Sequence, residues 1–514
     1  MTDDVVALEY DVSTRQIWVL LLSILVVALC GIAYELIIAA VSSYLLGNSV
    51  YQFSITIGFF MFAMGIGSYF SKFVETDLIG RFILVEILIS IIGGLCSLSL
   101  FVAFSQLNAF YALTMYGFIL VIGIMVGLEI PILTRIVSQK EHIQQSIANV
   151  LSLDYIGALI GSVMFPLLLL PHLGLIRSSF AIGLMNILVA MINIMVFGHL
   201  IKYKRRLMWL SWITLLALIA LTVFGTQLTR FAEHHLYFDE VIYEKQTPYQ
   251  RIIVTQSLRN QNHRLYIDGH IQFSERDEYR YHEALVHPVM SIAGKRDHVL
   301  ILGGGDGMAA REVLKYADVE LIHLVDIDPA ITDFSRRYAV IRELNQGSLD
   351  DPKLTIFNID AFIFINQPGI LYDRVIIDMP DPHNEALNKL YAKEFYRMIK
   401  RRMSPNAVLI SQSSSPFFTR RTFWSIQQTL EKVFQHTHSF HITVPAFGIW
   451  GFNMARLGEP IPTVFEVDVP TRFLTAQVMH AAAVFGKDIS ALPVPVNSIM
   501  EPKLYSLYLQ DLSD

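Results

Sequence analysis

The residues best suited to chemistry in this sequence are aspartates that end apolar stretches of its second half. Few Lys or Arg residues stand near them, and no His/Cys set with metal-ligand spacing accompanies them. Carboxylates gathered in one pocket attract cations, and they can accept a proton from a reacting group. The pattern predicts a strongly negative site for a cationic substrate. The five aspartates are Asp306, Asp326, Asp360, Asp378 and Asp381.

A glycine-rich turn surrounds the first of these acids. In VLILGGGDGMAAREVLKY, residues 299–316, an apolar strand pattern runs into Gly303, Gly305 and Gly307, which form GxGxG. Met308 occupies the position of the last glycine in the dinucleotide fingerprint GxGxxG. Glycines let a backbone approach a ligand closely, and an acid about 20 residues later, here Asp326, suits a ribose diol. The turn alone could be only a tight strand–helix connection, but both features together predict a nucleoside site of the methyltransferase type.

These residues need a scaffold that brings strand ends together. Apolar stretches near 298–302, 319–325, 353–358, 373–378 and 408–412 alternate with helical patterns, which predicts an α/β Rossmann-like, doubly wound sheet. Short strands over 241–285 precede it, and THSFHITVP and IWGFNMARL form a final hairpin pattern. Ligands bind beyond the carboxyl ends of such strands, where the acids lie. Strand-to-helix loops also favour acids as helix N-caps, an alternative that concerns first Asp328 and then Asp381.

The first half of the chain has a different composition. Of the 514 residues 53% are hydrophobic and only 16% are charged, and long apolar runs continue to about residue 225. About seven runs reach the length of a transmembrane helix: 17–42, 50–70, 82–104, 108–134, 150–170, 176–200 and 207–225. We therefore predict a polytopic α-helical membrane domain over 1–229, a β-strand subdomain over 230–290 and the Rossmann-like domain over 291–514.

The net charge of −6 and the lack of a basic run argue against a nucleic-acid partner. Cys30 and Cys96 lie in apolar runs, which leaves the second half without a disulfide or a thiol metal site.

Four acids lie inside the apolar runs, and ionisable groups in membrane helices are costly and mark functional candidates. They are Glu35, Glu86, Glu129 and Asp154. One interpretation is that each pairs with a neighbouring helix or lies near the membrane interface, and the other is a polar path for a cation. Lys and Arg residues concentrate in 71–81, 135–149 and 201–206. With seven spans, the positive-inside rule places these loops in the cytoplasm and the second half of the chain outside.

The second half resembles the spermidine synthase family of polyamine aminopropyltransferases, in its membrane-fused bacterial variety. The matching blocks are YQRI at 249–252, YIDGHIQFSERDEYRYHEALVHP at 266–288, ILGGGDGMAAREVLKY at 301–316, VDIDP at 325–329 and DMPDP at 378–382. The resemblance implies transfer of a 3-aminopropyl group from decarboxylated S-adenosylmethionine to putrescine, giving spermidine and methylthioadenosine, without a metal or a tightly bound cofactor. It also implies a homo-oligomer. Because the donor is made in the cytoplasm, we expect a multi-pass cell-membrane protein with a cytoplasmic synthase domain, against the charge rule.

The resemblance implies roles for particular residues. Asp378 is the implied general base that takes a proton from the acceptor amine. Asp306 faces the propylamine of the donor and repels the carboxylate of ordinary S-adenosylmethionine. The remaining implied donor contacts are Gln250, Gln272, Gly303, Gly305, Asp326 at the ribose, and Asp360 and Ala361 at the adenine; the acceptor contacts are Tyr281, His282 and Asp381. Tyr281 and His282 could instead be core residues, and Gln250 and Gln272 could bind only backbone.

Three departures from the family pattern concern mainly the acceptor. Ala361 replaces a glycine after the third strand, HNEALNKLY replaces a Gly-Pro motif, and Phe447 replaces a tyrosine near the acceptor. Two alternatives therefore stay open. One keeps the donor but uses a different or membrane-presented amine, such as a lipid headgroup, and the other is a polyamine-binding transporter or sensor. A methyltransferase is disfavoured because Asp306 would oppose the carboxylate of its cofactor.

Overall fold

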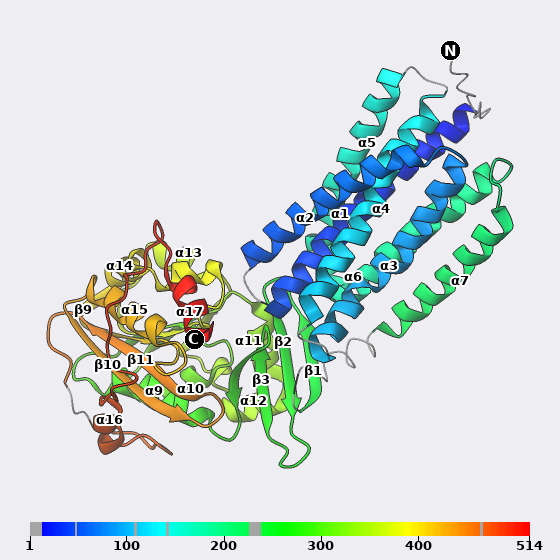
Figure 1. Cartoon of the computed structure of the whole chain (residues 1–514). Coiled ribbons are helices and arrows are strands. Elements are labelled where there is room, and N and C mark those ends of the chain that lie inside the picture. The colour runs from blue at the N-terminus through cyan, green and yellow to red at the C-terminus, as the bar shows by residue number, and fades with distance from the viewer. Residues whose placement is uncertain are drawn as a thin grey trace. The chain divides into compact units, whose positions relative to one another are not determined.

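The computed structural model describes residues 13–46, 49–106, 110–139, 143–225, 237, 239–462 and 466–513. The chain divides into two compact units, Met1–Val241 and Ile242–Asp514 (Figure 1). The predicted boundary between residues 229 and 230 lies outside the described residues, as do residues 108 and 109 of the fourth predicted membrane span.

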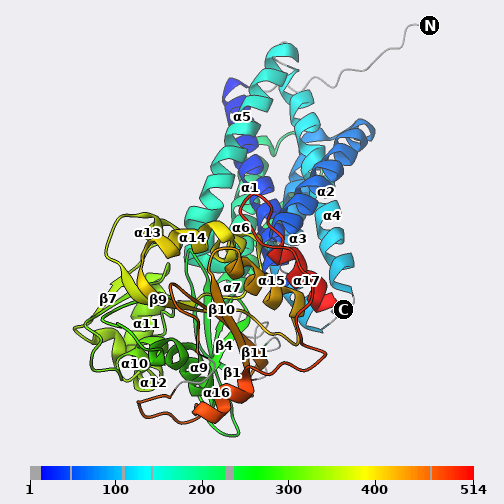
Figure 2. The ribbon, with the colours of Figure 1, turned by 90° about the vertical axis from the view of Figure 1, so that its left-hand side faces the viewer.

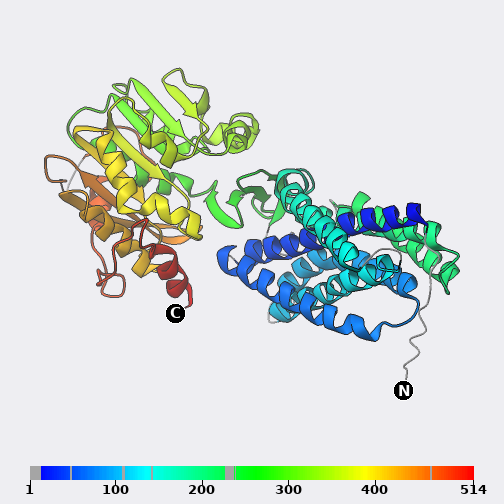
Figure 3. The same cartoon turned by 90° about the horizontal axis from the view of Figure 1, so that it is seen from above.

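The first unit is a bundle of long apolar helices that lie side by side (Figures 1 and 3). Large hydrophobic side chains stay exposed on its outside, among them Trp209 at 70% and Leu113 at 71%. Helices that are apolar all round are typical of a lipid environment or a protein interior. The helices are α1 (Thr14–Leu46), α2 (Ser49–Phe70), α3 (Leu78–Gln106), α4 (Tyr111–Val137), α5 (Ile143–Met164), α6 (Leu170–Phe197) and α7 (Lys204–Val223), with η1 (Ser71–Phe73) and η3 (Phe165–Leu169).

Six segments of the described residues are long and apolar enough to cross a membrane, and one of them, Ile143–Phe197, has 55 residues. This segment contains two helices that run in opposite directions, because α5 advances along α1 whereas α6 runs back along it. The contacts that show this are Gly157 with Leu25, Gly161 with Leu29, Ile182 with Cys30, and Asn193 with Ser23. Non-helical backbone at Gly174, with a φ of 71°, interrupts the first turns of α6. The described residues thus contain seven apolar helices; that they cross a membrane stays a prediction.

Two of the four acids in this unit meet each other. Glu86 of α3 and Glu129 of α4 are 0% and 1% exposed, and they are in electrostatic contact across the two helices. Both interpretations of these acids, pairing between helices and a polar path for a cation, stay predictions. Glu35 is also buried, whereas Asp154 is only half-buried.

The second unit begins with a small sheet that packs against helices of the large domain. Its strands, in spatial order, are β1 (Glu240–Gln246), β2 (Arg251–Gln256), β3 (His263–Ile267) and β4 (His270–Ser274). One apolar face, with Val254 and Phe273, packs on Met308 and Phe334. The β3–β4 turn contains Gly269 with a φ of 83°, a conformation that glycine adopts without strain.

The large sheet is mixed and has seven strands in the order β10-β11-β9-β8-β5-β6-β7. All five predicted strands are present and parallel, and the last begins earlier than predicted, at Met403. The predicted hairpin adds two antiparallel strands at one edge. The strands are β5 (His298–Gly303), β6 (Leu321–Val325), β7 (Leu354–Phe357), β8 (Tyr372–Asp378), β9 (Met403–Gln412), β10 (His436–Val444) and β11 (Gly448–Arg456).

Helices cover both faces of this sheet, because successive side chains of each central strand point to opposite faces. Val299 and Ile301 of β5 belong to a core with α9, α10 and α16, whereas Leu300 and Leu302 belong to a second core with α13, α14 and α15 (Figure 2). The helices are α9 (Glu278–Ser291), α10 (Met308–Val313), α11 (Pro329–Arg337), α12 (Ala339–Leu344), α13 (Ala361–Asn366), α14 (Lys393–Arg401), α15 (Arg420–Glu431), α16 (Ala476–Ala482) and α17 (Leu504–Ser513), with η4 (Ser348–Asp350) and η5 (Glu385–Tyr391).

The direction of winding changes between β5 and β8. From β5 the chain proceeds to β6 and β7 on one side, and then returns to β8 on the other side. In such sheets a ligand crevice opens at this point, outside the carboxyl ends of the strands. The register pairs Gly303 with Asp378 there, so that the glycine turn and the implied base are direct neighbours.

Candidate active site

The glycine turn is shaped by its closeness to two acids. Gly303 has a φ of 86°, and a side chain there would collide with the backbone of Asp378. A Cβ on Gly305 would lie 2.5 Å from Asp326 Oδ2. Glycine is therefore required at both positions, and the turn leaves room for a ligand against its backbone.

Asp326 lies at the end of β6, where two backbone amides hold its carboxylate. Gly305 N–H donates to Oδ2 at 3.1 Å, and Asp328 N–H donates to Oδ1 at 2.9 Å. Burial raises the pKa of Asp326 to about 7, against the effect of these hydrogen bonds. Asp328 is the N-cap of α11 and accepts from Ala330 N–H at 2.9 Å, so the cap interpretation is confirmed for this residue.

Both oxygens of Asp360 are occupied. Oδ1 accepts from Phe362 N–H at 2.7 Å and caps α13, and Oδ2 lies 2.6 Å from Lys389 Nζ. Ala361, the first residue of α13, is 6% exposed. The residues assigned to the adenine side are therefore an ion-paired acid and a buried methyl group.

The centre of the site is a hydrogen bond between Tyr281 and Asp378. The phenol of Tyr281, on α9, donates to Asp378 Oδ1 at 2.6 Å. Burial and the charge of Asp306 raise the pKa of Asp378 to about 6, while His282 and Tyr281 act against this shift. A carboxylate of this kind is ionised at neutral pH and basic enough to take a proton.

His282 is held as a cation beside these acids. Its Nδ1 lies 2.8 Å from Glu278 Oε2, and its Nε2 lies 4.0 Å from Asp306 Oδ2. Burial alone would lower the pKa of His282, but the hydrogen bond with Glu278 and the charge of Asp306 raise it to about 9. Arg311 donates to both oxygens of Glu278 at 3.0 Å each, which fixes the acid that orients the imidazole.

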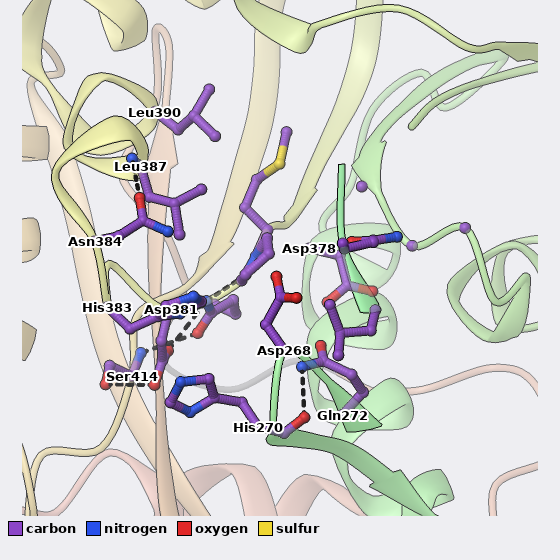
Figure 4. A pocket seen from close by; sticks show the side chains of 18 of the residues that line it. Asp268, His270, Gln272, Asp378, Asp381, His383, Asn384, Leu387, Leu390 and Ser414 are labelled. Carbon is purple, nitrogen blue, oxygen red and sulfur yellow. Dashed lines mark hydrogen bonds between the residues drawn. The ribbon is translucent and has the colours of Figure 1, made fainter. Parts of the chain in front are cut away.

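Asp381 lies at the end of the site that is opposite the glycine turn and Asp326. Ser414 Oγ donates to its Oδ2 at 3.1 Å, and Gln412 Nε2 lies 3.4 Å from its Oδ1 (Figure 4). Burial raises the pKa of Asp381 to about 7. The following η5 is capped by Asn384, so the cap interpretation of Asp381 is wrong.

Two histidines stack where the small sheet meets the loop after β8. The rings of His270 and His383 are 4.3 Å apart and nearly parallel (Figure 4). Burial lowers the pKa of both, that of His383 to about 3, so both are neutral at physiological pH. Gln272 Nε2 donates to the carbonyl of His270 at 3.1 Å, which agrees with the backbone interpretation of its amide.

One cavity of about 590 Å³ is lined by most of these groups. Every residue that the sequence analysis assigned to the site lines it: Gln250, Gln272, Tyr281, His282, Gly303, Gly305, Asp306, Asp326, Asp360, Ala361, Asp378 and Asp381. Tyr281 and His282 are buried, at 8% and 2% exposed, and they line the cavity as well. The cavity thus has Asp326 at one end and Asp381 at the other, with the hydrogen-bonded pair Tyr281 and Asp378 in its lining.

Comparison with known proteins decides the family. Residues 278–464 match the spermine/spermidine synthase domain. A polyamine aminopropyltransferase of Leptospira interrogans is 41% identical over 492 residues, which cover 95% of this chain and 97% of that protein. One of Oceanobacillus iheyensis is 39% identical and covers 97% and 98%. The chain belongs to the polyamine aminopropyltransferase family. The spermidine synthase structure from Thermotoga maritima is 26% identical over 48% of this chain and 84% of that chain, with a TM-score of 0.43.

The two relatives match this chain over the helical unit as well. The resemblance based on sequence motifs covered only the second half.

Several residues that line the cavity of this aminopropyltransferase were not predicted from the sequence. Gln412 ends the predicted strand 408–412 and Ser414 follows it; the carboxyl end of this strand had to join the others, so topology could have identified both residues. Glu278 does not line the cavity but orients His282, and its spacing of four residues from His282 on one helix was a signal for this contact. Lys389, which meets Asp360 only through folding, left none.

Proposed function

We propose that this enzyme transfers a 3-aminopropyl group from decarboxylated S-adenosylmethionine to putrescine, giving spermidine and methylthioadenosine. The observation that carries the proposal is the Tyr281–Asp378 hydrogen bond at the junction of the two acid-marked ends of one cavity. The family fixes the class of transfer, and the geometry around Asp378 supports these two substrates.

The donor occupies the end with the glycine turn. Asp326 binds the ribose diol, and the open backbone at Gly303 and Gly305 lets the nucleoside approach. Asp306 binds the propylammonium group and repels the extra carboxylate of ordinary S-adenosylmethionine. The adenine side is formed by Asp360 and Ala361, with Gln250 and Gln272 as further donor contacts.

The acceptor occupies the end with Asp381, which holds the diamine, and Tyr281 and His282 line the cavity beside Asp378. Putrescine is protonated at neutral pH, and its attacking ammonium gives one proton to Asp378. The nitrogen lone pair then attacks the methylene carbon bound to the sulfonium. The carbon–sulfur bond breaks, its electron pair stays on sulfur, and neutral methylthioadenosine leaves. Asp378 afterwards releases the proton to water.

We also propose that the first unit is a multi-pass domain of the cell membrane, with its boundary near residue 229, and that the synthase domain is cytoplasmic. The six long apolar segments and the exposed side chains of the bundle support the first part. The cytoplasmic origin of the donor supports the second. A reporter protein that works only in the cytoplasm should be active when it is fused after Asp514. If only a reporter that works outside the cell is active at this position, the result would contradict this placement. The homo-oligomer expected above remains part of the proposal.

The experiment uses purified full-length protein and measures methylthioadenosine release from decarboxylated S-adenosylmethionine. Putrescine, spermidine and lipid vesicles are offered in turn. Release that requires putrescine supports the proposal. Release with another polyamine or with vesicles, but not with putrescine, would keep the donor and move the function to a different acceptor.

A further inference from the structure

The last helix of the chain forms part of the cavity although it lies outside the matched domain. The spermine/spermidine synthase match ends at residue 464, whereas α17 begins at Leu504. The helix returns to pack beside α15 (Figure 2). Two of its side chains, Tyr508 and Leu512, line the cavity that contains Asp378 and Asp381.

This helix is fixed in place by side-chain hydrogen bonds. Asp511 accepts from the backbone N–H groups of Arg421 and Thr422, at 3.2 Å and 3.0 Å, and from Arg421 Nη1 at 3.1 Å. Near the start of the helix, Tyr505 N–H donates to Asn388 Oδ1 at 3.0 Å. A helix held at both of these points presents its cavity side chains in a defined position.

Tyr508 is the polar residue that α17 brings to the cavity. Its side chain is 7% exposed, and it lies within electrostatic range of Asp381. Burial and the charge of Asp381 raise the pKa of Tyr508, so that its hydroxyl stays neutral. Within the described part of the chain, no group forms a hydrogen bond with the hydroxyl of Tyr508.

Three aromatic side chains that line the cavity with Asp381 offer no hydrogen-bond acceptor. Phe447 and Phe418 have only carbon in their side chains, and the indole N–H of Trp450 can only donate. Ser414 already donates to Asp381 and exchanges a hydrogen bond with Thr419 at 2.7 Å. An ammonium group has three N–H donors to satisfy, so one carboxylate leaves donors unpaired.

We propose that Tyr508 binds the acceptor: its Oη accepts a hydrogen bond from the ammonium group that Asp381 attracts. The C-terminal helix thereby completes the acceptor end of the site. This inference rests on the proposed function, because it requires an amine at Asp381.

The test compares Tyr508→Phe with Tyr505→Phe in purified full-length protein. Both substitutions remove one oxygen from the same helix, but Tyr505 does not line this cavity. Tyr508→Phe should raise the KM for putrescine about tenfold, the effect of one hydrogen bond to a charged group. The kcat and the KM for decarboxylated S-adenosylmethionine should change less than about twofold, and Tyr505→Phe should match the wild type.

The two ways of failing are distinguishable. If the wild type releases no methylthioadenosine with any amine, the proposed function fails and this inference fails with it. If the wild type is active and Tyr508→Phe keeps its KM for every acceptor, only the inference fails. An equal rise in the KM for the donor would also overturn it, because that result indicates general damage to the cavity.

Discussion

Replacing Asp378 with Asn should change activity and stability in opposite directions. Loss of a general base lowers the rate about 10²- to 10⁴-fold, and Asn keeps the shape of the side chain. The pKa of Asp378 lies at about 6, roughly two units above its ordinary value, because of burial and Asp306. Each unit corresponds to about 1.4 kcal/mol, so the ionised carboxylate destabilises the folded state by up to about 3 kcal/mol above pH 6. Asn removes this penalty, and the variant should melt at a higher temperature at pH 8 but not at pH 4.

The wild-type rate should also fall at acidic pH. Because the base must be ionised, kcat/KM should fall about tenfold per pH unit below pH 6. Tyr281→Phe removes a hydrogen bond that lowers the pKa of Asp378, and should therefore move this acidic limb to higher pH.

The measurements are methylthioadenosine release between pH 5 and 9 and thermal melting of the full-length protein at pH 4 and pH 8. Asp333→Asn is the matched control, since this aspartate is exposed on α11, away from the cavity. It should change neither quantity. An Asp378→Asn variant that retains more than a tenth of the activity, or that melts at a lower temperature at pH 8, would refute the reasoning.

Four further outcomes follow from the same geometry. Asp381→Asn should raise the KM for putrescine about 10- to 100-fold, because a charged hydrogen-bond partner is lost, with an unchanged KM for the donor in steady-state kinetics. Gly305→Ala should raise the donor KM about 10- to 100-fold, since its Cβ displaces Asp326; a wild-type value would contradict this. Asp360→Ala should weaken donor binding in titration calorimetry and, by removing the N-cap of α13, lower the free energy of unfolding by about 1 kcal/mol in chemical denaturation. Finally, the raised pKa values of Asp326 and Asp381 mean that the folded state binds more protons than the unfolded state between their ordinary values and about 7. The melting temperature of the substrate-free protein should therefore fall as pH rises from 5 to 8, and a rise would contradict the assignment.

The positions of the central acids could be predicted because they depend only on strand order. Asp326 and Asp378 each follow a buried apolar stretch, and parallel strands place their carboxyl ends at one edge. The glycine turn fixed the site along that edge, since Gly303 is paired with Asp378. Tyr281 and His282 depended instead on the family resemblance.

The remaining contacts could not be predicted because they join segments with no shared local pattern. Lys389 reaches Asp360 across 29 positions, from a short η5 helix in a stretch that departs from the family motif. Tyr508 returns to the site from a helix about 130 residues beyond Asp378. Neither contact has a periodicity or spacing that sequence could reveal, because both depend on how the connections fold over the sheet.

The proposed reaction also accounts for how one acidic cavity can bind two cationic substrates and then release methylthioadenosine. Before transfer, the donor carries a sulfonium and an ammonium, and the acceptor brings further ammonium charge to Asp381. These cations offset the mutual repulsion of Asp306 and Asp378, which together with burial raises the pKa of Asp378. Transfer removes the charge from sulfur, and the propylamine leaves with the polyamine. Methylthioadenosine then has no charge for Asp306 to bind, and only neutral contacts such as those at the ribose hold it.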